Sequence, residues 1–202
     1  NWDDKFWNTT KITSEGHQAF IEAHTMKTNF ATCTFMESYL KHNGKKLQSK
    51  PTEITGENLV GLAYQQLVKQ GESLTLYKFG GYTVSRNHPP SELVQVAKKN
   101  MQNATQSGFE KMLEEQKSAW AKIWERSDIT IEGDVKAQQG IRFNIYQLIQ
   151  TYLGKDSRLN IGPKGFTGEK YGGSTYWDTE AYCIPFYMAT KNQQVARNLL
   201  EY

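Results

Sequence analysis

The sequence predicts an α+β fold in which antiparallel strands come first and helices follow. In the first third of the chain, polar and apolar side chains alternate and threonine is frequent, a pattern typical of strands. The run His88-Pro89-Pro90 ends this pattern, because proline interrupts a strand. Beyond it, apolar residues recur at steps of three and four, the period of a helix. The 202 residues are enough for one large domain or two small ones.

Strand character begins in residues 17–39, where threonines alternate with apolar side chains. Residues 58–68 and 73–86 are again strand-like, and the turn-forming sequence Lys69-Gln70-Gly71-Glu72 separates them. We therefore expect these two segments to pair as a β-hairpin, and the first third of the chain to form part of an antiparallel sandwich.

The helical part begins with a long segment over residues 91–126, whose apolar side chains share one face. Gly108 lies inside this segment, and we expect the helix to be weak there. Residues 128–134 then cross over, and Asp134 is expected to cap a second helix over residues 136–152. The long first segment is suited to linking two domains.

A long loop over residues 153–175 separates these helices from two shorter ones, near 177–190 and 192–202. Its glycines allow positive φ angles and a close approach of the backbone to a small ligand. A loop of about twenty residues inside a compact domain is usually functional. Short helices that alternate with long, glycine-rich loops indicate a helical array or barrel whose loops carry the function.

Composition limits the classes of function. The net charge is +3 and no basic run stands out, which gives nucleic-acid binding little support. The sequence shows no signal-peptide pattern and no apolar run of about 18 residues, so we expect a cytoplasmic protein without a membrane partner. Cys33 and Cys183 lack metal-ligand spacing and are expected to be reduced thiols, although a disulfide is possible. The missing N-terminal Met and an end inside the helix near 192–202 indicate an excerpt from a longer polypeptide.

Trp177 and Asp178 follow directly on the glycine-rich loop. Trp177 offers a flat apolar face for a sugar ring, and Asp178 can accept hydrogen bonds from two adjacent hydroxyls. A neutral polyol requires this pairing because it carries no charge to recognise. The residues alone leave another interpretation open, with Trp177 as a core aromatic and Asp178 or Thr179 as the N-cap of the next helix.

Residues 150–180 resemble glycoside hydrolase family 65, a family of inverting disaccharide phosphorylases. The family shares the skeleton Lys-Gly-hydrophobic-Thr-Gly-Glu-x-Tyr-x-Gly, followed by an aromatic residue and Trp-Asp-Thr-Glu. Here the skeleton occupies residues 164–173 and 176–180. Lys170 and the Gly-Gly-Ser-Thr-Tyr ending resemble the maltose-acting branch of the family.

This resemblance implies how the chain is organised. Residues 1–88 would be the C-terminal part of an N-terminal β-sandwich domain, and residues 89–127 a helical linker. Residues 128–202 would be the first helices of an incomplete (α/α)6 catalytic barrel. The resemblance also implies that the full-length protein is a homodimer.

The resemblance further implies a glycoside phosphorylase, which is a hexosyltransferase. Inorganic phosphate, the co-substrate, would attack the anomeric carbon of the non-reducing glucose of maltose or a related α-glucoside. The products would be β-glucose 1-phosphate and glucose, and neither a cofactor nor a metal would be needed. Trp177 and Asp178 would bind the donor glucose, and Tyr176, Tyr171 and Ser174 would complete the pocket wall.

The family's general acid is expected beyond Tyr202. We therefore expect this chain to supply residues that bind the donor glucose but no catalytic residue, and to be inactive alone. Two alternatives stay open at this point. The chain could be a non-catalytic carbohydrate-binding or structural fragment, or part of a phosphorylase or hydrolase for another α-glucoside.

Overall fold

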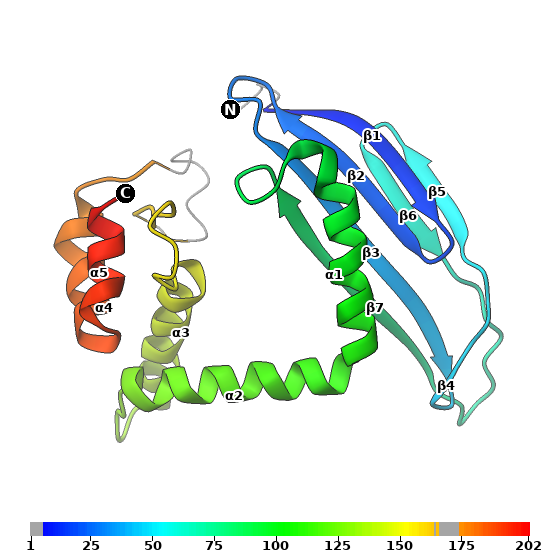
Figure 1. Cartoon of the computed structure of the whole chain (residues 1–202). Helices are drawn as coiled ribbons and strands as arrows, with labels where there is room; N and C mark the ends of the chain where they lie inside the picture. Colours follow the sequence, from blue (N-terminus) through cyan, green and yellow to red (C-terminus); the bar gives the residue numbers. More distant parts are fainter. Residues whose placement is uncertain (1–5, 164, 166–173) are drawn as a thin grey trace. The chain divides into compact units, whose positions relative to one another are not determined.

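A computed structural model describes residues 6–163, 165 and 174–202 (Figure 1). The chain forms two compact units, Asn1–Glu114 and Glu115–Tyr202. Strands come first and helices follow, which confirms the predicted α+β fold class. The domain boundaries predicted after residues 88 and 127, and the predicted barrel, stay predictions.

The first unit contains an antiparallel five-stranded sheet and a separate two-stranded ribbon (Figure 1). The sheet follows the order β1-β2-β3-β4, and β7 also pairs with β3; the ribbon is formed by β5 and β6. The strands are β1 (Trp7–Glu15), β2 (Gln18–Thr25), β3 (Ala31–His42), β4 (Lys45–Lys46), β5 (Thr52–Gly56), β6 (Leu59–Ala63) and β7 (Leu74–Val84). Strand character was therefore predicted in the correct region, although β1, β4 and β5 were not predicted.

The predicted hairpin between residues 58–68 and 73–86 is wrong. β6 pairs with β5, and β7 pairs with β3 along its whole length. The reason lies in the segment between them, which is tied to β3. The Tyr64 hydroxyl donates to the Ser38 carbonyl oxygen at 2.6 Å, and the Ser73 amide donates to Asn43 Oδ1 at 2.8 Å. This segment therefore carries the chain from the ribbon back to the sheet.

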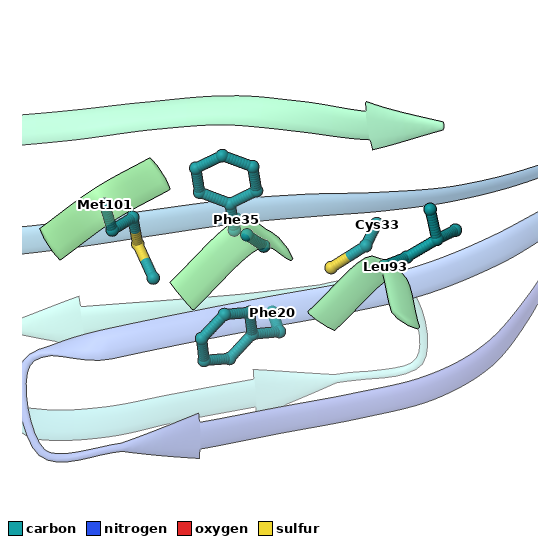
Figure 2. Packing of buried hydrophobic residues seen from close by; sticks show 6 residues of the cluster. Phe20, Cys33, Phe35, Leu93 and Met101 are labelled. Atoms are coloured by element: carbon teal, nitrogen blue, oxygen red, sulfur yellow. The ribbon is translucent and has the colours of Figure 1, made fainter. Parts of the chain in front are cut away.

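One face of the five-stranded sheet is covered by helix α1 (Leu93–Ser107) (Figure 2). Phe20 on β2 and Phe35 on β3 are paired neighbours in the sheet, and their buried rings lie under the helix. The helix contributes Leu93, Ala97 and Met101 to the same core. The hydroxyl of Thr83 on β7 donates to the Leu93 carbonyl oxygen at 2.9 Å, which fixes the start of the helix on the sheet.

Gly108 ends α1 and separates it from α2 (Phe109–Ser127), so the predicted weak point is a break between two helices. Its φ is +79°, a conformation that glycine adopts without the steric cost that other residues incur. A short 3₁₀ turn, η1 (Pro90–Glu92), precedes α1. The long helical segment predicted from residue 91 to 126 is confirmed in extent and divided at the expected residue.

The second unit contains α3 (Val135–Thr151), the π-helical turn η4 (Thr179–Cys183), α4 (Ile184–Thr190) and α5 (Gln193–Leu200). Asp134 caps α3 as predicted, because its side chain accepts hydrogen bonds from the amides of Lys136 and Ala137. The helices and the loop that follows α3 share one core, formed by Tyr152, Ile161, Cys183, Tyr187, Val195 and Leu199. Cys33 and Cys183 are free thiols, each buried in the core of its own unit.

None of the helices in the described part of the chain combines the length and the apolar character needed to cross a lipid bilayer.

Candidate functional site

The predicted site residues lie at the junction between the glycine-rich loop and the helices of the second unit. Tyr176, Trp177 and Asp178 directly precede η4, and Ser174 is exposed just before them. Tyr171 lies outside the described residues, as does most of the glycine-containing motif. The arrangement is therefore built from the two ends of the loop.

The two ends of the loop meet at a neck that is held in three places. The hydroxyl of Thr179, which is buried, donates to the carbonyl oxygen of buried Ile161 at 2.8 Å. The Asn160 side chain donates to the hydroxyl of Thr175. A Cβ atom on Gly162 would lie 3.4 Å from the Ser174 carbonyl oxygen, so the two backbones are in contact there. Closed ends of this kind are typical of compact functional surface loops.

Trp177 lies next to this neck and is 71% exposed. The alternative in which it is a core aromatic is therefore wrong for the described chain. Its ring centroid is 6.2 Å from that of Tyr182, which is also largely exposed. The two rings form one aromatic surface beside the neck, suited to contact with the apolar face of a sugar ring.

Tyr182 was not predicted from the sequence, and its spacing explains why. In an α-helix, residues five positions apart do not face each other. The turn η4 is π-helical, with hydrogen bonds between residues five apart, and it brings Trp177 and Tyr182 to the same side. A π-helical turn inside or beside an α-helix is itself frequent at functional sites.

Asp178 occupies the N-cap position of η4 without acting as a cap. It has helical dihedral angles, and its side chain makes no capping hydrogen bond in the described part of the chain. Thr179 uses its hydroxyl on Ile161 instead. The capping alternative is therefore not supported for either residue, and the half-exposed carboxylate of Asp178 is left available to accept hydrogen bonds from a ligand.

The core beneath the site fixes the start of the helices. Cys183 is buried, and burial raises the pKa of its thiol, with a further increase from the negative charges of Asp178 and Glu180. Tyr187 is fully buried, donates to the Leu148 carbonyl oxygen at 2.8 Å, and packs edge-on against Tyr152. Trp177 and Asp178 thus project from a backbone that is anchored to a rigid core.

This arrangement presents the chemical groups that recognise a neutral polyol. An aromatic surface next to a carboxylate offers a stacking face and hydrogen-bond acceptors. Within residues 6–163, 165 and 174–202, no three His, Cys, Asp or Glu side chains gather closely enough to hold a metal ion. The described residues of the site are therefore suited to holding a substrate in place.

Two family models match the chain. The family model described as "Glycosyl hydrolase family 65, N-terminal domain" matches residues 1–123. A second model, "Glycosyl hydrolase family 65 central catalytic domain", matches residues 142–202 and so includes the loop, its neck and Trp177.

Individual relatives extend the similarity over the whole chain. A maltose phosphorylase of Bacillus subtilis is 39% identical over 100% of this chain and 26% of its own length. An alpha,alpha-trehalose phosphorylase of Thermoanaerobacter brockii is 33% identical over the same shares of the two chains. Among solved structures, a putative kojibiose phosphorylase from human microbiome superimposes with a TM-score of 0.82 at 27% identity, over 97% of this chain and 25% of that one. The chain thus spans about a quarter of the length of the relatives it matches.

Proposed function

Because the chain belongs to glycoside hydrolase family 65, we propose that it is part of an inverting phosphorylase that transfers glucose from maltose to inorganic phosphate. The observation that carries this proposal is the pair of exposed Trp177 and half-exposed Asp178, held at a closed loop neck within the segment that matches the family's catalytic domain. The greater identity to the maltose phosphorylase, 39% against 33% for the trehalose phosphorylase, favours maltose as the substrate.

In the proposed reaction, a phosphate oxygen attacks the anomeric carbon of the non-reducing glucose of maltose. The glycosidic bond breaks, a general acid protonates the leaving oxygen, and glucose departs as the second product. Attack from the face opposite the leaving group inverts the configuration and gives β-glucose 1-phosphate. Phosphate is already an anionic nucleophile, so the second carboxylate that inverting hydrolases use to activate water is not required.

The role proposed for this chain is to bind the donor glucose. Trp177 would stack on the apolar face of the ring, and Asp178 would accept hydrogen bonds from two of its hydroxyls. The transition state resembles an oxocarbenium ion with a flattened ring. Hydrogen bonds from the ring hydroxyls to a fixed carboxylate that tighten as the ring changes shape would lower the barrier, rather than only improve binding.

The test is phosphorolysis of maltose by the complete gene product that contains this chain. We expect β-glucose 1-phosphate to form only when phosphate is present. Loss of the charged acceptor in Asp178→Ala would cost about 2–4 kcal/mol of transition-state stabilisation, or roughly one and a half to three decades in kcat/KM. Glu132→Gln is the control, because it removes an exposed carboxylate of the same unit that lies before α3.

Each of the other outcomes would change the assigned function or site. Glucose release without phosphate would indicate a hydrolase, and no turnover of any substrate would indicate a non-catalytic carbohydrate-binding or structural role. An Asp178→Ala variant as active as the Glu132→Gln control would remove Asp178 from the donor site.

Trehalose is the second candidate substrate, because the trehalose phosphorylase is 33% identical over the whole chain. Trehalose, kojibiose and nigerose should therefore be assayed beside maltose, since relatives named for each of these sugars match the chain. A higher kcat/KM for one of them would change the assigned substrate while retaining the phosphorylase.

A further inference from the structure

The second unit contains two adjoining cavities that share a basic lining. Their volumes are about 330 and 580 Å³, within the range of about 300–1,000 Å³ usual for small-molecule sites. Lys122, Lys155 and Lys191 line both of them. We call the two cavities together the basic groove. Of the predicted sugar-site residues that the structure describes, Ser174, Tyr176, Trp177 and Asp178, none lines the basic groove.

The lining of the basic groove is cationic wherever the structure describes it. Arg126 adds a fourth cation to the smaller cavity, and no Asp or Glu of the described residues lines either cavity. Two carboxylates that are close in sequence pair with other arginines, Asp128 with Arg142 at 2.6 Å and Asp156 with Arg158 at 2.7 Å. Glu125, next to Arg126, lines neither cavity. Cations gathered around one hollow create a field that attracts an anion.

Two of these cations, Arg126 and Lys191, lie close together. The Arg126 guanidinium donates to the carbonyl oxygen of Lys191 at 3.3 Å. Partial burial, and then the charge of Arg126, lower the pKa of the Lys191 ammonium. An anion bound between them would relieve this repulsion, and an ammonium together with a guanidinium supplies the donors that a phosphate accepts.

The larger cavity adds an aromatic wall to the basic groove. Trp120 on α2 and Tyr146 on α3 line it, and their ring centroids are 5.0 Å apart. The side chains of Gln116 and Gln150 line the same cavity. Aromatic faces and amides are the groups that recognise the ring and hydroxyls of a sugar, and here they lie beside the cations.

We propose that the basic groove binds a hexose monophosphate. The phosphate would lie among the three shared lysines, and the sugar ring would lie against the pair of Trp120 and Tyr146. This site goes beyond the proposed donor-glucose site, since it recognises a phosphate ester on different residues. A ligand there would also bridge α2 and α3, and so would stabilise the second unit.

The experiment is calorimetric titration of the complete gene product with glucose 6-phosphate, glucose and inorganic phosphate. We expect glucose 6-phosphate to bind most tightly, because it alone engages both the cations and the aromatic wall. Lys191→Gln should raise its Kd about tenfold through the loss of one charge-assisted contact. Lys136→Gln is the matched control, because Lys136 is an exposed lysine of the same unit that lines neither cavity.

A second pair of variants separates this site from the proposed donor site. Tyr146→Leu keeps an apolar side chain and should weaken binding of glucose 6-phosphate while leaving that of inorganic phosphate unchanged. Asp178→Ala should leave the affinity for glucose 6-phosphate unchanged, whatever its effect on phosphorolysis. Thermal unfolding of each variant without ligand checks that it is folded.

Three results would overturn the proposal. One is no binding of glucose 6-phosphate at millimolar concentration. Another is equal loss of affinity in Lys191→Gln and the Lys136→Gln control. The third is loss of binding in Asp178→Ala with full retention in Lys191→Gln and Tyr146→Leu, which would assign the ligand to the donor site.

Discussion

Gly154, the third residue after α3, is the position where a single methyl group should be most disruptive. Its φ is +71°, in the left-handed region, and its carbonyl oxygen accepts a hydrogen bond from Asn198 Nδ2 at 2.7 Å. A Cβ atom at this position would lie 2.3 Å from Val195 Cγ1 and 2.7 Å from both Val195 Cβ and Cγ2. No real Cβ atom approaches a neighbour so closely, so Gly154→Ala requires Val195 to move.

The free-energy cost of Gly154→Ala has two parts, and a control variant separates them. An alanine in the left-handed region costs about 1–2 kcal/mol for backbone strain. Displacing the buried Val195 adds about 1–3 kcal/mol, the usual cost of overpacking a core. Gly133 has φ +86° with nothing within 4 Å of its would-be Cβ atom, so Gly133→Ala should show only the first part.

The assay is native-state hydrogen exchange of the complete gene product, read on peptides that cover α3, α4 and α5. Local opening is the appropriate measure because a global midpoint is poorly defined in a large multidomain protein. In Gly154→Ala, amides of α5 should exchange roughly 5- to 150-fold faster than in Gly133→Ala, as an extra 1–3 kcal/mol requires. Equal protection of α5 in both variants would refute the reasoning, because it would show that Val195 yields without cost.

Two further predictions concern the helix cap and the buried thiol. Asp134→Ala should lower stability by about 0.5–2 kcal/mol and fray the first turn of α3, because the amides of Lys136 and Ala137 lose their acceptor. Asp134→Asn keeps an acceptor, so it should retain most of the protection of these amides in hydrogen exchange. Equal fraying in both variants would contradict the assignment of the cap. Burial raises the pKa of the Cys33 thiol to about 11, so the folded state keeps a proton that the unfolded chain releases near its ordinary pKa of 9.0. The contribution of the protonated thiol to stability is complete below pH 9.0 and is lost as the pH rises toward 11. Unfolding measured across that window should therefore show a smaller fall in stability for Cys33→Ala than for the unsubstituted protein. An identical fall in the variant and the unsubstituted protein would be inconsistent with a buried, protonated thiol.

The helices could be predicted more closely from the sequence than the sheet, and the reason is physical. Helical hydrogen bonds are local, so Gly108 and Asp134 each determine a helix end through residues within a turn of themselves. Strand partners lie far apart in sequence, and alternation does not specify them. The partner of β7 depends on contacts such as that of Tyr64 with Ser38, which are 26 residues apart and leave no local signal.

The same contrast between local and long-range signals explains which residues of the candidate site were predicted from the sequence and which were not. Trp177 and Asp178 could be predicted because their chemistry is visible in the residues themselves. Tyr182 was not predicted, since only the π-helical turn places it beside Trp177. The neck was not predicted either, because the bond from Thr179 to Ile161 joins residues 18 apart across the loop.

The neck explains how Trp177 and Asp178 can keep fixed positions although a glycine-rich segment directly precedes them. Glycines widen the conformations open to a loop, and a binding residue inside such a loop would lose entropy whenever it was ordered. Trp177 and Asp178 avoid this cost because they lie outside the loop, on the helical side of a neck whose two anchors, Ile161 and Thr179, are both buried. On this argument, the residues that position Trp177 and Asp178 are the buried ones beneath them, Ile161 and Thr179.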